Sequence, residues 1–220
     1  MIKGCIFDLD GTLANTIESI ARAVNCALEH LGYETRTIEE FKFFGGDGMN
    51  MAVQRALAAD GETDAVRVAE GAALARKFFS EDPLYKVKPY EGILEMLHTF
   101  KERKIRLAVL SNKPHLQAIE VVEAIFGTGI FDMIQGQEEN IPRKPDPAGV
   151  RNILKRWDYT PEECLYIGDS NTDMQTACAA GMKKAGVTWG FRPQKELEDN
   201  GADYIVHHPL ELLKVQEEIG

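Results

Sequence analysis

Two aspartates separated by a single residue stand where an apolar stretch of the sequence ends. Asp8 and Asp10 follow residues 5–7, which have the character of a short buried strand, and Gly11 comes directly after them. Burying an unpaired carboxylate is costly, so two of them at the end of a core strand need a cation, a proton or a chemical task. Taken alone, however, the pair also fits an ordinary Asp-Gly turn.

Two further apolar stretches lead into residues that can do chemistry. One leads into Ser111 and Asn112, and the other into Asp169, with Asp173 four residues later. In an open parallel sheet the carboxyl ends of the strands lie along one edge, where ligands bind. We therefore expect one crevice to hold a hydroxyl group and four carboxylates, those of Asp8, Asp10, Asp169 and Asp173.

The charges of this predicted crevice indicate a metal ion and a phosphoryl group. Four carboxylates would repel one another strongly, and a divalent cation removes that repulsion. The predicted ligands are all oxygen, with no His or Cys nearby, which suits Mg²⁺. Lys144, with Arg143 beside it, lies in a proline-rich loop near the same edge and could offset the charge of a phosphoryl group. An aspartate could then attack phosphorus and form an aspartyl-phosphate.

Each of these residues also has an alternative structural role. Ser111 and Asn112 could cap a helix, and Lys144 could be a solvated charge in a turn. Asp169 could cap the helix that follows it, and the helix dipole would favour Asp173 in the first turn of that helix. The functional interpretation therefore depends on all of them reaching one sheet edge in the right order.

The periodicity of the chain predicts the elements that position these residues. Residues 15–82 show helical spacing, with about four helices, whereas strands and helices alternate from Pro89 onwards. This alternation predicts an α/β fold, with a parallel, Rossmann-like sheet sandwiched by helices and an all-helical domain inserted after the first strand. We expect residues 1–14 and 84–220 to form the core, and residues 15–83 to form the inserted domain.

The composition limits the partners and the location of the protein. A chain of 220 residues with a formal net charge of −10 can bury a sizeable core but disfavours nucleic acid and anionic membranes as partners. Four cysteines without CxxC spacing are expected to be small buried residues in a reducing compartment. No secretory signal or membrane-spanning stretch is recognisable, so a cytoplasmic location is expected.

Taken together, the motifs resemble those of the haloacid dehalogenase-like (HAD) phosphohydrolases. The matching segments are Asp8-Leu-Asp10-Gly-Thr-Leu, Ser111-Asn112, Lys144-Pro-Asp-Pro and Gly168-Asp169-x₃-Asp173. Residues 109–114, 186–191 and 201–204 resemble the phosphoglycolate phosphatase branch of this superfamily. The inserted helical domain resembles its cap, and residues 43–48 are the candidate cap loop facing the crevice, unless they form a plain interhelical loop.

The resemblance implies a role for each residue. Asp8 attacks phosphorus, while Asp10 protonates the leaving oxygen and then takes a proton from water. Ser111, the backbone of Asn112 and Lys144 hold the phosphoryl oxygens. The implied ligands of Mg²⁺ are Asp8, the backbone carbonyl of Asp10 and Asp169. Asp173 contacts the ion either directly or through an intervening group.

We therefore expect a Mg²⁺-dependent phosphatase that hydrolyses a small phosphorylated metabolite, with 2-phosphoglycolate as the first candidate, and that works as a monomer or homodimer. Inorganic pyrophosphatase, sugar-phosphate phosphatase and phosphomutase activities are alternatives within the same superfamily. A non-catalytic protein that binds a phosphate ligand is a more remote alternative. It predicts the loss of Asp8 or Asp10, and both are present.

Overall fold

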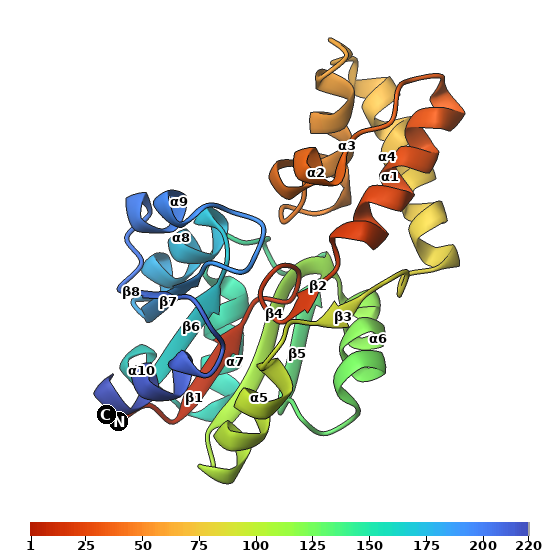
Figure 1. Ribbon diagram of the computed structural model, residues 1–220. Helices are drawn as coiled ribbons and strands as arrows, with labels where there is room; N and C mark the ends of the chain where they lie inside the picture. The colour runs from red at the N-terminus through yellow and green to blue at the C-terminus, as the bar shows by residue number, and fades with distance from the viewer. Residues whose placement is uncertain (220) are drawn as a thin grey trace. The chain divides into compact units, whose positions relative to one another are not determined.

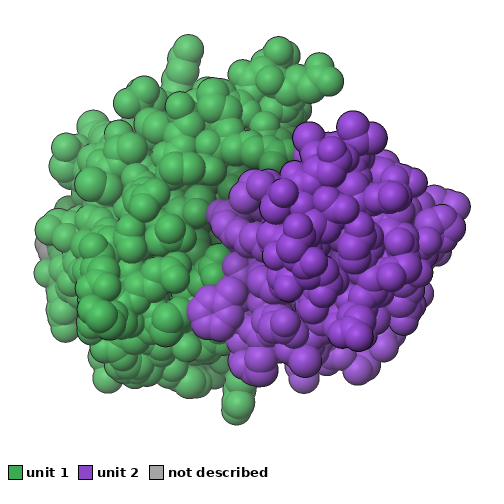
Figure 2. All heavy atoms as spheres, turned by 90° about the horizontal axis from the view of Figure 1, so that it is seen from above, with its two compact units in different colours: residues 1–14, 89–220 green, residues 15–88 purple. Residues whose placement is uncertain are grey.

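The computed structural model describes residues 1–219 and divides the chain into two compact units. The sheet unit consists of Met1–Ala14 and Pro89–Gly220, and the helical unit consists of Asn15–Lys88 (Figure 2). The second boundary thus lies at residue 88, where the sequence pattern suggested 83. Across residues 1–219, no helix combines the length and the apolar character that crossing a membrane requires.

Six parallel strands form the sheet of the sheet unit (Figure 1). In spatial order they are β5 (Met133–Gln137), β4 (Arg106–Pro114), β1 (Gly4–Phe7), β6 (Cys164–Gly168), β7 (Lys183–Val187) and β8 (Tyr204–Val206). Phe7 at the end of β1 is in register with Val109 of β4 and Ile167 of β6. The residues that follow these three positions therefore meet at one edge of the sheet, as predicted.

Helices cover both faces of this sheet, which confirms the predicted α/β sandwich (Figure 1). Ile6 faces a cluster that includes Trp157, whereas the ring of Phe7 lies 6.4 Å from the ring of Phe100. Successive side chains of a strand point to opposite faces, so these two residues anchor helices on the two sides. The helices are α5 (Ile93–Glu102), α6 (His115–Phe126), α7 (Ala148–Trp157), α8 (Asn171–Ala180), α9 (Gln194–Asp199) and α10 (Glu211–Ile219), with a 3₁₀ turn, η1, at Pro161–Glu163.

The helical unit contains the four helices that the periodicity predicts. They are α1 (Ile17–Leu31), α2 (Ile38–Phe44), α3 (Met49–Ala58) and α4 (Ala65–Glu81). Helix α1 ends at Gly32, whose φ of 83° is the left-handed conformation that favours glycine after a helix. Thr37 and Glu40 form the expected capping box of α2.

The structure corrects the predicted end of β4. The apolar pattern predicts a strand over residues 105–110 and a helix that opens at residues 113 and 114. The strand instead continues to Pro114, so Ser111, Asn112 and Lys113 lie within it. The pairing with β5 shifts register between Leu110 and Pro114. Such irregularities bend a strand and redirect its side chains, commonly beside active sites.

Smaller differences concern short elements and two cysteines. The two-residue strands β2 (Ala14–Asn15) and β3 (Lys88–Pro89), which pair with each other, were not predicted, nor were α9 and η1. Elements this short do not complete a hydrophobic period. All four cysteines were expected to be buried, but Cys26 is only partly buried and Cys178, on the outer side of α8, is exposed.

Candidate active site

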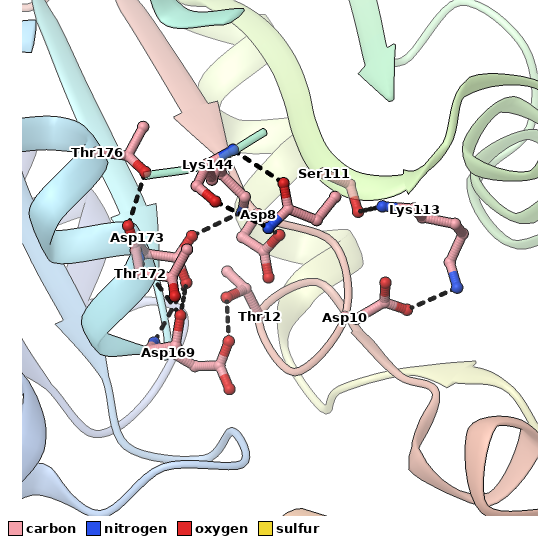
Figure 3. A network of polar contacts seen from close by, with 12 residues as sticks. Asp8, Asp10, Thr12, Ser111, Lys113, Lys144, Asp169, Thr172, Asp173 and Thr176 are labelled. Atoms are coloured by element: carbon pink, nitrogen blue, oxygen red, sulfur yellow. Dashed lines mark hydrogen bonds and ion pairs between the residues drawn. The ribbon is translucent and has the colours of Figure 1, made fainter. Parts of the chain in front are cut away.

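The predicted site residues converge at one edge of the sheet unit (Figure 3). Asp8 follows β1, Ser111 lies in the last part of β4, and Asp169 follows β6. Lys144 comes from the loop between β5 and α7, and Asp173 from the first turn of α8. All five side chains are buried, so the cluster lies inside the protein and not on a solvated turn.

Lys144 lies between two carboxylates of this cluster, those of Asp8 and Asp173. Its Nζ lies 2.6 Å from Asp8 Oδ1 and 2.7 Å from Asp173 Oδ1, and 4% of its side chain is exposed. Burial alone would lower the pKa of Lys144, but Asp173 and Asp8 hold that pKa well above its usual value. The side chain is therefore an ammonium group. Arg143, the other basic residue of the loop, is exposed.

Three carboxylates in the cluster form a group that can hold a metal ion. Asp8, Asp169 and Asp173 each place a carboxylate oxygen within 4.8 Å of the others. Burial raises the pKa of Asp8 well above its usual range, and Lys144 opposes this only in part. Burial, assisted by the charge of Asp173, raises the pKa of Asp169 to about 7. Three crowded carboxylates beside one ammonium lack positive charge, and their oxygen ligands fit a hard divalent cation.

Asp173 combines the two roles that its sequence position allowed. One carboxylate oxygen accepts hydrogen bonds from Lys144 and from the Tyr166 hydroxyl, at 2.7 and 3.1 Å. The other accepts from the Ser170 hydroxyl at 2.6 Å, and the same two residues form the capping box of α8. Asp173 therefore holds Lys144 from a fixed place on a helix. Tyr166 has the appearance of an ordinary core residue in the sequence, which gave no indication of this hydroxyl contact.

Asp169 does not cap α8, because Ser170 takes that position. Its two oxygens accept hydrogen bonds from the Thr12 hydroxyl at 3.1 Å and from the backbone N–H of Phe191 at 2.7 Å. The loop after β7 thus holds a carboxylate that follows β6. Gly190 in this loop packs so closely that a Cβ atom there would lie 2.3 Å from Asp169 Cβ and 2.5 Å from the carbonyl oxygen of Gly11.

Gly190→Ala is expected to lower kcat/KM by about 100-fold, because the added methyl group displaces Asp169 and small displacements of reacting groups are costly. Phosphate release and a melting curve measure activity and folding together. Gly71→Ala in helix α4 is the matched control, since a Cβ at residue 71 would meet a methyl group of Val53 at 3.0 Å and no site residue. Unchanged activity in Gly190→Ala would show that the placement of Asp169 is not limiting.

Asn112 has a structural contact that the sequence did not reveal. Its side-chain oxygen accepts a hydrogen bond from the Lys144 backbone N–H at 2.9 Å, and its amide nitrogen donates to the Lys144 carbonyl oxygen at 3.3 Å. This reciprocal pair fixes the loop that carries Lys144. The Ser111 hydroxyl meanwhile accepts from the backbone N–H of Lys113 at 3.1 Å.

Asp10 points away from the other carboxylates (Figure 3). Its Oδ1 forms an ion pair with Nζ of Lys113 at 3.2 Å, and the two side chains are 12% and 6% exposed. The two aspartates of the first motif therefore occupy different surroundings, Asp8 beside Lys144 and Asp10 beside Lys113. Lys113 belongs to residues 109–114, which resemble the phosphoglycolate phosphatase branch, but its sequence position did not predict this contact with Asp10.

Comparison with known proteins agrees with this geometry. Residues 5–187 match the family model described as "Haloacid dehalogenase-like hydrolase". A phosphoglycolate phosphatase of Cereibacter sphaeroides is 36% identical over 94% of this chain and 94% of its own length. Both matches span most of the chain, and the family model includes the four motifs from Asp8 to Asp173.

Solved structures show the same fold. A crystal structure from Lactobacillus delbrueckii subsp. bulgaricus is 31% identical, with a TM-score of 0.94 over 97% of this chain and 98% of that one. CbbY from Rhodobacter sphaeroides in complex with phosphate is 25% identical, with a TM-score of 0.77 over 96% of each chain. This chain therefore belongs to the haloacid dehalogenase-like hydrolases, within their phosphoglycolate phosphatase-like branch, and is a phosphatase.

Proposed function

We propose that the chain is a Mg²⁺-dependent phosphatase that hydrolyses a small phosphate monoester, first of all 2-phosphoglycolate, through an aspartyl-phosphate. One observation carries the mechanism, namely that Asp8 lies against the Lys144 ammonium while Asp10 lies apart from it. Two carboxylates in different surroundings can take different roles in one reaction. The substrate is suggested by the relatives that are named phosphoglycolate phosphatase.

In the first proposed step, Lys144 and Ser111 hold the phosphoryl oxygens while a carboxylate oxygen of Asp8 attacks phosphorus. The bond from phosphorus to the ester oxygen breaks, and Asp10 gives its proton to that oxygen. In the second step, Asp10 takes a proton from water, which attacks phosphorus and releases Asp8 and inorganic phosphate. Burial of the cluster keeps bulk water away from the intermediate.

We propose that Asp8, Asp169 and the backbone carbonyl of Asp10 hold Mg²⁺. Asp173 is the third carboxylate of this group, and its proposed part is to position Lys144 while it supports the ion, either directly or through an intervening group. When bound, the ion would supply positive charge for the phosphoryl oxygens. The raised pKa values of Asp8 and Asp169 support this assignment, because a nearby cation favours the ionised carboxylates.

We propose that the helical unit is the cap. Within this unit, the loop between α2 and α3 is held by Arg55, whose guanidinium donates to the carbonyl oxygens of Phe43 and Phe44 and to Asp47 Oδ2, the last at 2.6 Å. These contacts give a glycine-rich loop one defined shape. We also propose a cytoplasmic location, which the four free cysteines support.

Rates measured side by side on 2-phosphoglycolate, pyrophosphate, nucleotides and hexose phosphates test the proposed function. We expect the highest kcat/KM on 2-phosphoglycolate, and EDTA should abolish the activity. A higher value on pyrophosphate or a hexose phosphate would reassign the substrate. Conversion of a sugar phosphate to its isomer would indicate a mutase. Activity that persists after EDTA treatment would contradict the metal assignment.

Mg²⁺ is expected to raise the melting temperature more at pH 8 than at pH 6. The pKa of Asp169 in the folded protein is about 7, against an ordinary value of 3.8, so below pH 7 a proton competes with the ion for this carboxylate. Because Mg²⁺ must displace this proton, its affinity falls by up to about tenfold for each pH unit below that pKa. Without metal, the same raised pKa makes the contribution of Asp169 to stability fall as the pH rises through 7. Melting curves at both pH values, with and without Mg²⁺, measure the difference, and equal shifts would contradict it.

A further inference from the structure

Lys113 is a buried cation whose position suggests a specific task. Among residues 1–219, Lys113 and Lys144 are the only lysines that are buried. Lys144 contacts Asp8 and Asp173, whereas Lys113 forms its ion pair with Asp10 (Figure 3). The sheet unit thus has one ammonium beside the proposed nucleophile and another beside the proposed proton donor.

The backbone around Lys113 fixes the direction of its side chain. Lys113 lies within the segment of β4 where the register shifts, between Leu110 and Pro114, and its N–H donates to the Ser111 hydroxyl at 3.1 Å. Its carbonyl oxygen packs so closely against Gly136 of β5 that a Cβ there would lie 2.7 Å away. Residues 111 and 113 are therefore presented together, the first toward the phosphoryl group and the second toward Asp10.

The task of Asp10 locates the leaving group relative to Lys113. A group that protonates the leaving oxygen must come within about 2.6–3.2 Å of it. Lys113 Nζ lies 3.2 Å from Asp10 Oδ1, so the ammonium lies within about 6 Å of a leaving oxygen that this same Oδ1 contacts. In 2-phosphoglycolate, the carboxylate carbon is two bonds beyond this oxygen and so lies within reach of the ammonium.

We propose that Lys113 recognises a negative charge on the leaving group, so that the sheet unit itself selects esters of anionic alcohols. This proposal rests on the proposed function, and specifically on Asp10 acting at the leaving oxygen. Charge-assisted hydrogen bonds are stronger than neutral ones, and in a buried site their energy is less screened by water. A leaving group with a carboxylate gains this interaction, and a neutral one does not.

The alternative is that Lys113 only positions Asp10. In that case, the loss of the ammonium lowers the rates of all esters by the same factor, because every leaving oxygen needs the proton. Recognition of charge adds a further loss that only esters with an anionic leaving group show. Two esters of similar size that differ in this charge therefore separate the two roles.

The experiment compares 2-phosphoglycolate with 2-hydroxyethyl phosphate, which lacks the carboxylate, for wild type, Lys113→Met and Lys113→Arg. We expect Lys113→Met to lower kcat/KM on 2-phosphoglycolate by about 10–100-fold, mainly through KM, the size of a lost charged hydrogen bond. The loss on 2-hydroxyethyl phosphate should be about tenfold smaller or less, because this ester has no carboxylate to bind Lys113 and shows only the effect of the variant on Asp10. Lys113→Arg, which keeps the charge, should recover part of the preference for 2-phosphoglycolate.

Equal losses on both esters, or no loss on either, would overturn the role of Lys113 and leave the phosphatase assignment intact.

A second pair, 3-phosphoglycerate and glycerol 1-phosphate, separates the two proposals. If the wild type ignores 2-phosphoglycolate but prefers 3-phosphoglycerate, and this preference needs Lys113, the proposed substrate is wrong and Lys113 still recognises charge. If Lys113→Met does not fold, Lys113→Gln replaces it in the same measurements. The wild-type preference within each pair of esters is then a second test of charge recognition. A wild type that prefers the ester with the neutral leaving group overturns the proposal. A wild type that hydrolyses none of the four esters contradicts both proposals.

Discussion

Asp8→Asn is expected to lower kcat by at least about 10⁴-fold, the scale observed when a catalytic nucleophile is removed. The asparagine amide keeps the size of the side chain, but its oxygen is a poor nucleophile. In the structure, Asp8 lies at the end of the central strand, with its Oδ1 2.6 Å from Lys144, so the replacement changes chemistry more than packing. Phosphate release from 2-phosphoglycolate in the presence of Mg²⁺ measures the effect.

Two further variants make this result decisive. Asp8→Ala excludes a return of activity by deamidation of the asparagine. Asp199→Asn is the matched control, because Asp199 forms an exposed ion pair with Lys195 outside the site, and it should retain the wild-type rate. If Asp8→Asn released phosphate as fast as wild type, Asp8 would not be the nucleophile.

Lys144→Met is expected to have the second largest effect, lowering kcat/KM by about 10²–10³-fold through the loss of a preorganised charge at the phosphoryl group. It also removes the ammonium that two buried carboxylates share, those of Asp8 and Asp173. Breaking a buried ion pair by removing one partner typically costs about 3–5 kcal/mol of stability. Kinetics and melting curves, each with and without Mg²⁺, measure the two consequences.

A graded set of variants separates charge from positioning at Lys144. Tyr166→Phe removes only the hydroxyl that donates to Asp173, so its expected loss is at most about tenfold, the scale of one hydrogen bond. Lys183→Met changes an exposed lysine of β7 and should leave activity unchanged. A Lys144→Met variant with wild-type kinetics would contradict the assignment of Lys144 to the phosphoryl group.

Much of the fold follows from local patterns in the sequence. The apolar spacing of α1, its stop at Gly32 and the capping box of α2 all depend on residues within a few positions of one another. The α/β alternation then places the strand ends on one edge, because crossovers between parallel strands leave no other arrangement. The convergence of the four motifs was therefore predictable.

The contacts between the motifs could not be predicted from local sequence patterns. Lys113 lies in the last part of β4, where the register with β5 shifts, and its ammonium pairs with Asp10. Tyr166 lies in the apolar stretch that forms β6, yet its hydroxyl donates to Asp173. The alternatives for Asp169 and Asp173 also needed coordinates, since only the structure shows that Ser170 caps α8, with Asp173 completing its capping box.

The sequence by itself determined the fold class, the order of the motifs and the group of acidic and basic residues at the sheet edge, because these follow from hydrophobic period and strand direction. The tertiary structure decided which cation faces which carboxylate, pairing Lys144 with Asp8 and Lys113 with Asp10. The physical reason is distance along the chain. Lys144 is 136 residues from Asp8, and their contact depends on strand order, register and loop packing, none of which a local pattern encodes.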